Sequence, residues 1–176
     1  MRRVVVTGSE CTGKTRLVEH LARRFGCPWA PEHARAYADR KRAPLGPEDV
    51  EPIGRGQLEG EDRAAAQAGA LVLLDSDLVS TLLYARHYYG ECPPWIEAAA
   101  RQRRADLYLL LHPDVPWLPD GVRDRGDRRD EMHALFEATL AELGCHVVQV
   151  RGEWAVRRAT GERAIDELLA TPTGPR

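Results

Sequence analysis

The sequence predicts an α/β protein in three layers (α/β/α), with a mostly parallel five-stranded sheet between two layers of helices. Apolar runs alternate along the chain with helical stretches, and parallel strands need such helical crossovers. The first apolar run leads through a glycine-rich turn directly into an amphipathic helix. The 176 residues, 43% of them hydrophobic, suffice for one domain with a buried core, which we expect over 1–170.

Five apolar runs predict the strands. They occupy 3–7, 28–30, 70–75, 106–111 and 146–150, and the run 28–30 is the weakest. A helix is expected after the first run, because apolar residues recur at helical spacing from Leu17 to Phe25. Parallel sheets bind ligands beyond the carboxyl ends of their strands, so the residues that follow each run are candidates for a site.

The other segments carry weaker signals. Prolines and glycines interrupt the polar stretch 41–69, for which we expect a loop with short helices that covers a substrate, or an unstructured connection. A last helix is expected over 158–169, where an isoleucine and two leucines share one face. The tail 171–176 has no apolar residue and is expected to be flexible.

Composition narrows the class of function. The formal net charge of −2 gives no overall attraction to nucleic acid or to a membrane surface. The four cysteines are scattered without a spacing typical of zinc, and we expect reduced thiols. The N-terminal apolar run is too short for a signal peptide, and no stretch reaches the length of a membrane span. A cytoplasmic protein is expected, and its oligomeric state, homo-oligomer included, stays open.

One motif dominates the N-terminal region. It reads Gly8-Ser9-Glu10-Cys11-Thr12-Gly13-Lys14-Thr15 and fits the pattern GxxxxGK[ST] between a strand and a helix. In this pattern backbone N–H groups curl around the β-phosphate and the helix dipole faces the anion. Lys14 reaches the phosphate oxygens, and Thr15 ligates Mg²⁺. The motif predicts a P-loop NTPase fold, with a plain glycine turn as the alternative.

Two acids follow the run 70–75. Asp75 ends the run in the form of the second nucleotide signature, an acid that holds Mg²⁺ directly or through water. Asp75 is therefore the metal candidate, together with Thr15. Asp77 is a candidate for binding a substrate hydroxyl, although the two roles can be exchanged. Either acid can instead cap the following helix.

A second polar pair follows the run 28–30. Glu32 and Arg35 lie three residues apart, which places them on one side of a helical turn. A kinase that acts on an alcohol benefits from a carboxylate that orients the hydroxyl and accepts its proton. Glu32 is therefore the suggested base, and Arg35 a further substrate contact. An exposed ion pair at a helix start is the alternative.

The segment 120–129 is dense in arginine, with aspartate and glycine between. Guanidinium groups on a closing lid stabilise the charge of a transferred phosphoryl group and exclude water. We expect such a lid over about 113–130, with Arg123 and Arg128 as its catalytic arginines. A solvated surface of mixed charge and a nucleic-acid contact are the alternatives, although interleaved aspartates weaken attraction to a phosphate backbone.

Aromatic residues are few, and several stand close together in the sequence. Tyr84, Tyr88, Tyr89 and Trp95 form this group, while Trp29 and Trp117 lie elsewhere. A flat, cationic ring stacks well on such side chains, but most buried aromatics only fill a core.

The order of the motifs is similar to that of a known kinase family. After the phosphate motif come Pro31-Glu32-His33-Ala34-Arg35, Leu74-Asp75-Ser76-Asp77, Tyr88-Tyr89-Gly90 and Pro116-Trp117-Leu118-Pro119-Asp120-Gly121-Val122-Arg123. Together they resemble the ribosylnicotinamide kinase family, and more closely the kinase half of the NadR-type bifunctional proteins of bacterial NAD salvage. The resemblance extends from about Val4 to Leu169.

The resemblance implies a P-loop kinase with ATP and Mg²⁺ as cofactors. It implies transfer of the γ-phosphate to the 5′-hydroxyl of nicotinamide riboside, which gives nicotinamide mononucleotide. In that family a tryptophan and a tyrosine sandwich the nicotinamide ring. Tyr88 matches the tyrosine, whereas Pro31 stands where the tryptophan is expected, and Trp29 is the candidate to replace it.

The sequence therefore predicts a phosphotransferase with a small-molecule acceptor. Its catalytic candidates are Lys14, Glu32, Asp77, Arg123 and Arg128. A kinase for another nucleoside or small alcohol is an alternative. An ATP-binding regulatory protein without a small-molecule acceptor is another, and a nucleic-acid-binding ATPase is the third.

Overall fold

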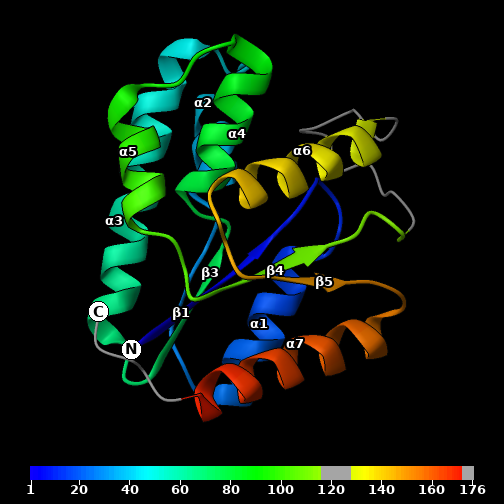
Figure 1. Ribbon diagram of the computed structural model, residues 1–176. Helices are drawn as coiled ribbons and strands as arrows, with labels where there is room; N and C mark the ends of the chain where they lie inside the picture. Colours follow the sequence, from blue (N-terminus) through cyan, green and yellow to red (C-terminus); the bar gives the residue numbers. More distant parts are fainter. Residues whose placement is uncertain (116–127, 172–176) are drawn as a thin grey trace.

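The structure, a computed structural model, describes residues 1–115 and 128–171 (Figure 1). Five parallel strands form one sheet in the order β2-β3-β1-β4-β5. The strands are β1 (Arg2–Thr7), β2 (Trp29–Ala30), β3 (Leu71–Asp75), β4 (Leu107–Leu111) and β5 (Val147–Val150). All five predicted strands are confirmed, and each begins within one residue of its predicted start.

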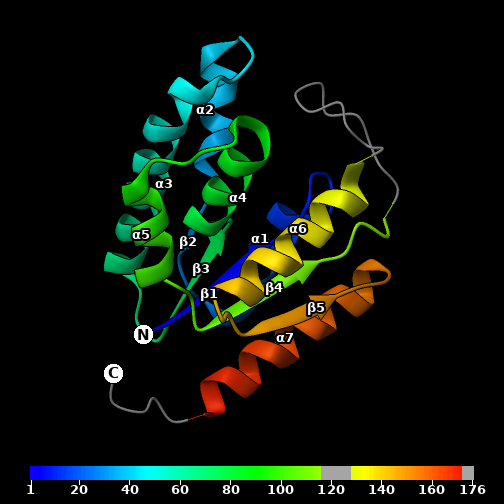
Figure 2. The same cartoon turned by 45° about the horizontal axis from the view of Figure 1, so that its top comes forward.

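Helices connect the strands and cover both faces of the sheet. In the described residues they are α1 (Lys14–Phe25), α2 (His33–Lys41), α3 (Val50–Gln67), α4 (Leu78–Tyr89), α5 (Pro94–Gln102), α6 (Arg129–Glu142) and α7 (Trp154–Ala170), with a short 3₁₀ helix η1 (Pro47–Asp49) before α3. Figure 2 shows α2 to α5 grouped beside β2 and β3, and α6 lying over β4. Helices α1 and α7 pack together on the other face. The predicted three-layer fold is confirmed.

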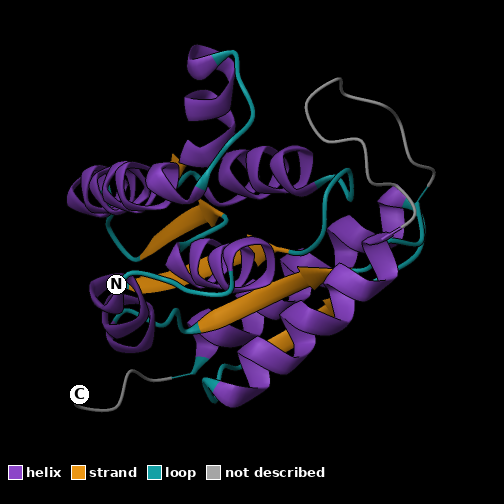
Figure 3. Cartoon of the chain, turned by 90° about the horizontal axis from the view of Figure 1, so that it is seen from above, coloured by secondary structure: helices purple, strands orange, loops and turns teal. Residues whose placement is uncertain are grey.

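The core has two halves, one on each face of the sheet. Val4 and Val6 pack with buried residues of α1 and α7, whereas Val5, between them, packs with residues of α4, α5 and α6. This alternation is what a strand buried on both faces requires. Because all strands are parallel, their carboxyl ends lie at one edge of the sheet (Figure 3). The phosphate motif follows β1 at this edge, and Asp75 and Asp77 lie at and just after the end of β3.

The prediction of a loop over 41–69 was wrong for most of its length, because 50–67 form the long helix α3. Pro52 lies in the first turn of α3, where no backbone N–H is needed for the helix. A Cβ on Gly54 would lie 2.7 Å from Ile96 Cδ1, and one on Gly56 would lie 2.1 Å from the ring of His33. These glycines therefore serve close packing rather than breaking the helix.

Two other expectations differ from the structure or fall outside it. Helix α7 begins at Trp154, four residues before the predicted start at 158. Most of the predicted lid, residues 116–127, and most of the tail, residues 172–176, lie outside the described residues. In the described part of the chain, no helix combines the length and the apolar character that a membrane crossing requires.

Candidate active site

The phosphate motif forms the turn between β1 and α1. Gly8 has a φ of 135° and Gly13 a φ of 87°, and Cys11 between them has a φ of 53°. A Cβ on Gly8 would lie 2.7 Å from the carbonyl oxygen of Leu111, at the end of β4. Glycine is required there, because an L side chain would clash with backbone in a conformation that it rarely adopts.

Lys14, the first residue of α1, lies beneath this turn. Its side chain is 9% exposed, and Nζ donates a hydrogen bond to the Ser9 carbonyl at 2.9 Å. The Thr12 hydroxyl donates to the same carbonyl, also at 2.9 Å. The ammonium group is thus held inside the loop, where a phosphate oxygen can take the place of the Ser9 carbonyl as its acceptor.

Arg157 of α7 holds the phosphate loop in place through a hydrogen bond to its backbone. It is 1% exposed, and its guanidinium donates to the carbonyls of Thr12 (3.0 Å), His112 (2.9 Å) and Gly152 (2.6 Å) and pairs with Asp114. One side chain therefore joins the phosphate loop, the end of β4 and the turn after β5. We did not predict it from the sequence.

Asp75 and Thr15 meet beside the loop. The Thr15 hydroxyl donates to Asp75 Oδ2 at 2.6 Å, while the buried Asp75 Oδ1 has no hydrogen-bond partner in the described residues. Burial raises the pKa of Asp75, and the nearby Lys14 and Thr15 oppose this rise. An acid with one unsatisfied oxygen next to a threonine hydroxyl fits Mg²⁺, which prefers oxygen ligands.

A metal here would need ligands beyond the protein. No group of three or more histidine, cysteine, aspartate or glutamate side chains that could hold a metal occurs in the described residues. Mg²⁺ binds through one or two protein groups together with substrate phosphates and water. The pair of Thr15 and Asp75 is of this kind.

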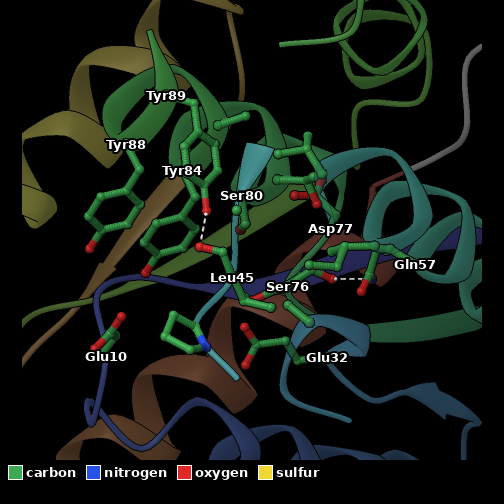
Figure 4. A pocket seen from close by; sticks show the side chains of 17 residues that line it. Glu10, Glu32, Leu45, Gln57, Ser76, Asp77, Ser80, Tyr84, Tyr88 and Tyr89 are labelled. Carbon is green, nitrogen blue, oxygen red and sulfur yellow. Dashed lines mark hydrogen bonds between the residues drawn. The ribbon is translucent and has the colours of Figure 1, made fainter. Parts of the chain in front are cut away.

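A pocket of about 440 Å³ opens next to the phosphate loop. Its wall includes residues 44–46 and the polar or aromatic side chains of Glu10, Glu32, Gln57, Asp77, Tyr84, Tyr88 and Tyr89. Figure 4 shows Glu10 and Glu32 on one side of this pocket and the tyrosines on the other. The structure thus brings two predicted substrate acids, Glu32 and Asp77, into one cavity with the predicted tyrosine, Tyr88.

Asp77 is held tightly at the inner end of the pocket. It caps α4 by accepting from the Val79 N–H at 3.1 Å, and Oδ2 accepts from the Tyr108 hydroxyl at 2.8 Å. Burial raises the pKa of Asp77 to about 6, against the lowering effect of these hydrogen bonds. The acid therefore combines the capping role with a place in the pocket wall.

Glu32 lines the pocket, whereas Arg35 is not part of the pocket wall. Glu32 occupies the N-cap position of α2 without a side-chain capping bond. Arg35 is exposed in the first turn of α2, and its positive charge lowers the pKa of Asp75.

The two predicted aromatic residues of the site, Tyr88 and Trp29, lie in different parts of the structure. Tyr88 lines the pocket, is 43% exposed, and stacks on Tyr84 with ring centroids 6.0 Å apart and an interplanar angle of 4°. Trp29 lies on β2 and packs against the core cluster of α1, on the other face of the sheet. The structure therefore does not bring Trp29 into the pocket wall.

The predicted lid arginines are only partly described. Arg123 lies outside the described residues. Arg128 precedes α6 and is half-exposed, with Nε 4.0 Å from Glu131 Oε2. Its neighbour Arg129, which we did not single out, donates to the Val115 carbonyl at 2.8 Å and so connects the start of α6 to the segment after β4.

Comparison with known proteins agrees with this geometry. Residues 3–157 match the family model of the AAA domain. The chain belongs to this family. The family assignment covers the phosphate loop, the acids after β3 and Arg157, and it confirms the predicted P-loop fold.

Relatives connect the chain to NadR proteins. The chain is 31% identical over 160 residues to the trifunctional NAD biosynthesis/regulator protein NadR of Escherichia coli (strain K12), covering 87% of this chain and 39% of that protein. A NadR structure in complex with NR matches with a TM-score of 0.85, 28% identity and coverage of 99% of this chain and 53% of that one.

A second NadR structure, in complex with NAD and AMP-PNP, matches with a TM-score of 0.83 and 26% identity, covering 99% and 51% of the two chains. The chain thus spans about two fifths of the curated relative and about half of each solved chain. The resemblance to NadR-type proteins inferred from the motifs is confirmed.

Proposed function

We propose that this chain is an ATP-dependent kinase that phosphorylates the 5′-hydroxyl of nicotinamide riboside, forming nicotinamide mononucleotide in NAD salvage. The observation that carries the proposal is the pocket beside the phosphate loop, lined by Asp77 and Glu32 and by stacked tyrosines. The similar NadR structures support both substrates. One is in complex with NR, the abbreviation of nicotinamide riboside, and the other with AMP-PNP, an ATP analogue.

On the donor side, residues 8–15 bind the phosphates of ATP. Lys14 exchanges its bond to the Ser9 carbonyl for one to a phosphate oxygen, and the N–H groups at the start of α1 face the same anion. Thr15 and Asp75 would hold Mg²⁺, which neutralises charge on the phosphates when bound. Arg123 and Arg128 belong to the segment that we propose as a lid over the transferred group.

On the acceptor side, Asp77 and Glu32 are the two carboxylates that can bind the ribose hydroxyls. Phosphoryl transfer needs little covalent help from the protein, so orientation of the hydroxyl is the main contribution of these acids. The carboxylates of the wall also attract a positively charged ring, for which Tyr88 offers a stacking face. Arg35, outside the wall, contributes positive charge on the phosphate side.

The proposal includes a cytoplasmic location and a small molecule as the partner. All four cysteines are free, and burial raises the pKa of the Cys27, Cys92 and Cys145 thiols, which suits a reducing compartment.

A kinase for a different nucleoside is the second candidate. It is favoured by Pro31, which stands where the resemblance leads us to expect a stacking tryptophan, and by Trp29, which lies outside the pocket wall. One face of the acceptor ring would then lack an aromatic partner in the pocket wall. This wall fits an acceptor whose ring needs an aromatic partner on one face only.

ADP release with a panel of ribosides tests these proposals. We expect release that depends on nicotinamide riboside, and loss of turnover in Lys14→Ala with an unchanged circular dichroism spectrum. Arg23→Ala, an exposed basic residue on the same helix, is the control and keeps wild-type turnover. Release with another nucleoside alone would favour the second candidate. ATP binding without release for any acceptor would favour a regulatory protein.

A further inference from the structure

The side chain of Gln57 connects two backbone segments that carry the acids of the site. Gln57 lies in α3, is 3% exposed and lines the pocket. Its Oε1 accepts from the His33 N–H at 3.0 Å, and its Nε2 donates to the Ser76 carbonyl at 3.1 Å. An N–H only donates and a carbonyl only accepts, so these two partners determine the orientation of the amide.

Both partners stand next to residues of the proposed chemistry. His33 begins α2 and follows Glu32, and Ser76 lies between Asp75 and Asp77. Ser76 has a φ of 66°, in the left-handed region, so its backbone needs support from its surroundings. The Glu32 side chain makes no capping bond to α2, and Gln57 satisfies the first N–H of that helix in its place.

We infer that Gln57 is a positioning residue for phosphoryl transfer: its amide sets the separation between Glu32 and the segment Asp75–Asp77. The inference rests on the proposed function, in which these acids orient the acceptor and hold the metal. A displacement of about 1 Å in such a constellation lowers turnover by about 100-fold, so a single tether across the pocket has a measurable effect.

Two substitutions test the hydrogen bonds of Gln57 to the His33 N–H and to the Ser76 carbonyl. Gln57→Met keeps the approximate volume of the side chain and removes the hydrogen bonds to the His33 N–H and the Ser76 carbonyl, together with the longer one to Glu61 Oε1. Gln57→Glu keeps an acceptor for the His33 N–H but donates to the Ser76 carbonyl only while the introduced carboxyl is protonated. Gln67→Glu, at the exposed end of the same helix, makes the same chemical change away from the pocket and is the matched control.

The surroundings of position 57 determine the pH range of the test. Glu61 Oε1 lies 3.4 Å from Gln57 Nε2, and burial raises the pKa of Glu61 to about 7. The charges of Arg3, Arg103 and Asp77 act on Glu61. Glu10, Glu32 and Asp77 line the same pocket as Gln57, and the His33 N–H bonds to it. All of these groups are present in wild type and variants alike, so the compared quantity is the ratio of variant to wild-type kcat at each pH.

The expected results are as follows. Gln57→Met lowers kcat by about 10- to 100-fold, while the dissociation constant for ATP stays within about twofold of wild type. For Gln57→Glu, the kcat ratio is close to one near pH 6, where burial keeps the introduced carboxyl protonated, and falls by about tenfold or more towards pH 9, where the carboxyl is ionised. For Gln67→Glu the ratio does not change with pH.

Several results would overturn the inference. One is a kcat of Gln57→Met within about twofold of wild type. Another is a higher KM for the acceptor at unchanged kcat, which would make Gln57 a direct substrate contact. If Gln57→Met does not fold, Gln57→Glu decides: a ratio as flat with pH as that of Gln67→Glu contradicts a positioning role.

A measurement made without substrate tests this inference independently of the proposed function. Hydrogen exchange at the His33 amide reports the tether directly, because that N–H bonds to Gln57. We expect exchange at least about tenfold faster in Gln57→Met than in Gln67→Glu. Equal exchange rates would contradict the inference even in an active enzyme. If the wild type releases no ADP in response to an acceptor, the proposed function is refuted. The exchange rates alone then test whether Gln57 connects the two segments.

Discussion

Tyr108→Phe tests the electrostatics of Asp77, the acid at the inner end of the pocket. Tyr108 is fully buried on β4, and its hydroxyl donates to Asp77 Oδ2 at 2.8 Å. Burial raises the pKa of Asp77 to about 6, and this hydrogen bond is the largest of the effects that oppose the rise. Phenylalanine keeps the ring in place and removes the donor. The pKa of Asp77 should therefore rise further.

The magnitude follows from the type of bond. A hydrogen bond to a charged group contributes about 1.5–3 kcal/mol, and one pKa unit corresponds to about 1.4 kcal/mol. Only the excess over the roughly 1 kcal/mol of a neutral hydrogen bond, about 0.5–2 kcal/mol, changes the pKa. The pKa of Asp77 should thus rise by about 0.5–1.5 units, from about 6 to about 6.5–7.5.

The sign of the effect on stability follows from linkage. The folded-state pKa of Asp77 lies above 3.8, the ordinary value of an aspartate, so the folded protein binds more protons than the unfolded chain between these two pH values. Over that range the free energy of unfolding decreases as the pH rises. In Tyr108→Phe the decrease continues to a higher pH, up to the new pKa. The variant should therefore lose more stability at high pH than at low pH.

Urea unfolding of wild type and variant at about pH 5 and about pH 8.5 measures this difference. At the lower pH Asp77 is protonated in both proteins, and we expect a destabilisation of about 1 kcal/mol, the loss of a neutral hydrogen bond. At the higher pH, where Asp77 is ionised in the wild type, we expect about 0.5–2 kcal/mol more, the excess of a hydrogen bond to a charged group over a neutral one. Equal destabilisation at the two pH values would refute the reasoning. If Asp77 orients the acceptor hydroxyl, the acid limb of kcat/KM should also move to higher pH in the variant.

Two further substitutions test the donor side. Asp75→Asn should lower kcat by about 100-fold or more through loss of the metal ligand, without loss of thermal stability, because burial already disfavours the charge of Asp75. Lower thermal stability, or an unchanged Mg²⁺ dependence of turnover, would contradict this. Gly8→Ala should lower the free energy of unfolding by about 2–4 kcal/mol, because of the left-handed φ and the approach to Leu111. Gly69→Ala, where an added Cβ meets nothing within 4 Å, is the control, and similar urea midpoints for the two variants would argue against the strain.

The sheet could be predicted closely because its signals are local. The central strands β1, β3 and β4 are short runs that are largely buried on both faces, so the run itself carries the pattern. The edge strands β2 and β5 are only partly buried. Helix α3 could not be predicted in the same way. Gly54 and Gly56 resemble helix breakers in the sequence, yet they leave room for Ile96 and for His33 of neighbouring helices. Only the packing of distant segments explains why glycine stands at these positions.

The candidate site likewise has a part that the sequence predicts and a part that it does not. The phosphate loop is contiguous in the sequence and binds mainly through backbone N–H groups, so its motif is sufficient to predict it. The side chains that hold the site in place come from distant elements and match no motif. The sequence nevertheless contains a signal for Arg157, because this residue lies at helical spacing with the buried residues Gly161, Ala164 and Ile165 of α7. A charged residue at such a position needs buried partners, and the site supplies them.

Neighbouring side chains also explain how two acids can be buried close together beside the pocket. The charge of Asp77 raises the pKa of Glu61, but Arg3 lies 2.7 Å from Glu61 and its charge lowers the pKa of both acids. Tyr108 and Gln57 add neutral donors to the same acids. Of the two acids, Asp77 lines the pocket, and Glu61 is not part of its wall. The Tyr108 hydroxyl and Arg3 lower the pKa of Asp77, so in the proposed function this acid can offer a carboxylate to the acceptor although burial disfavours its charge.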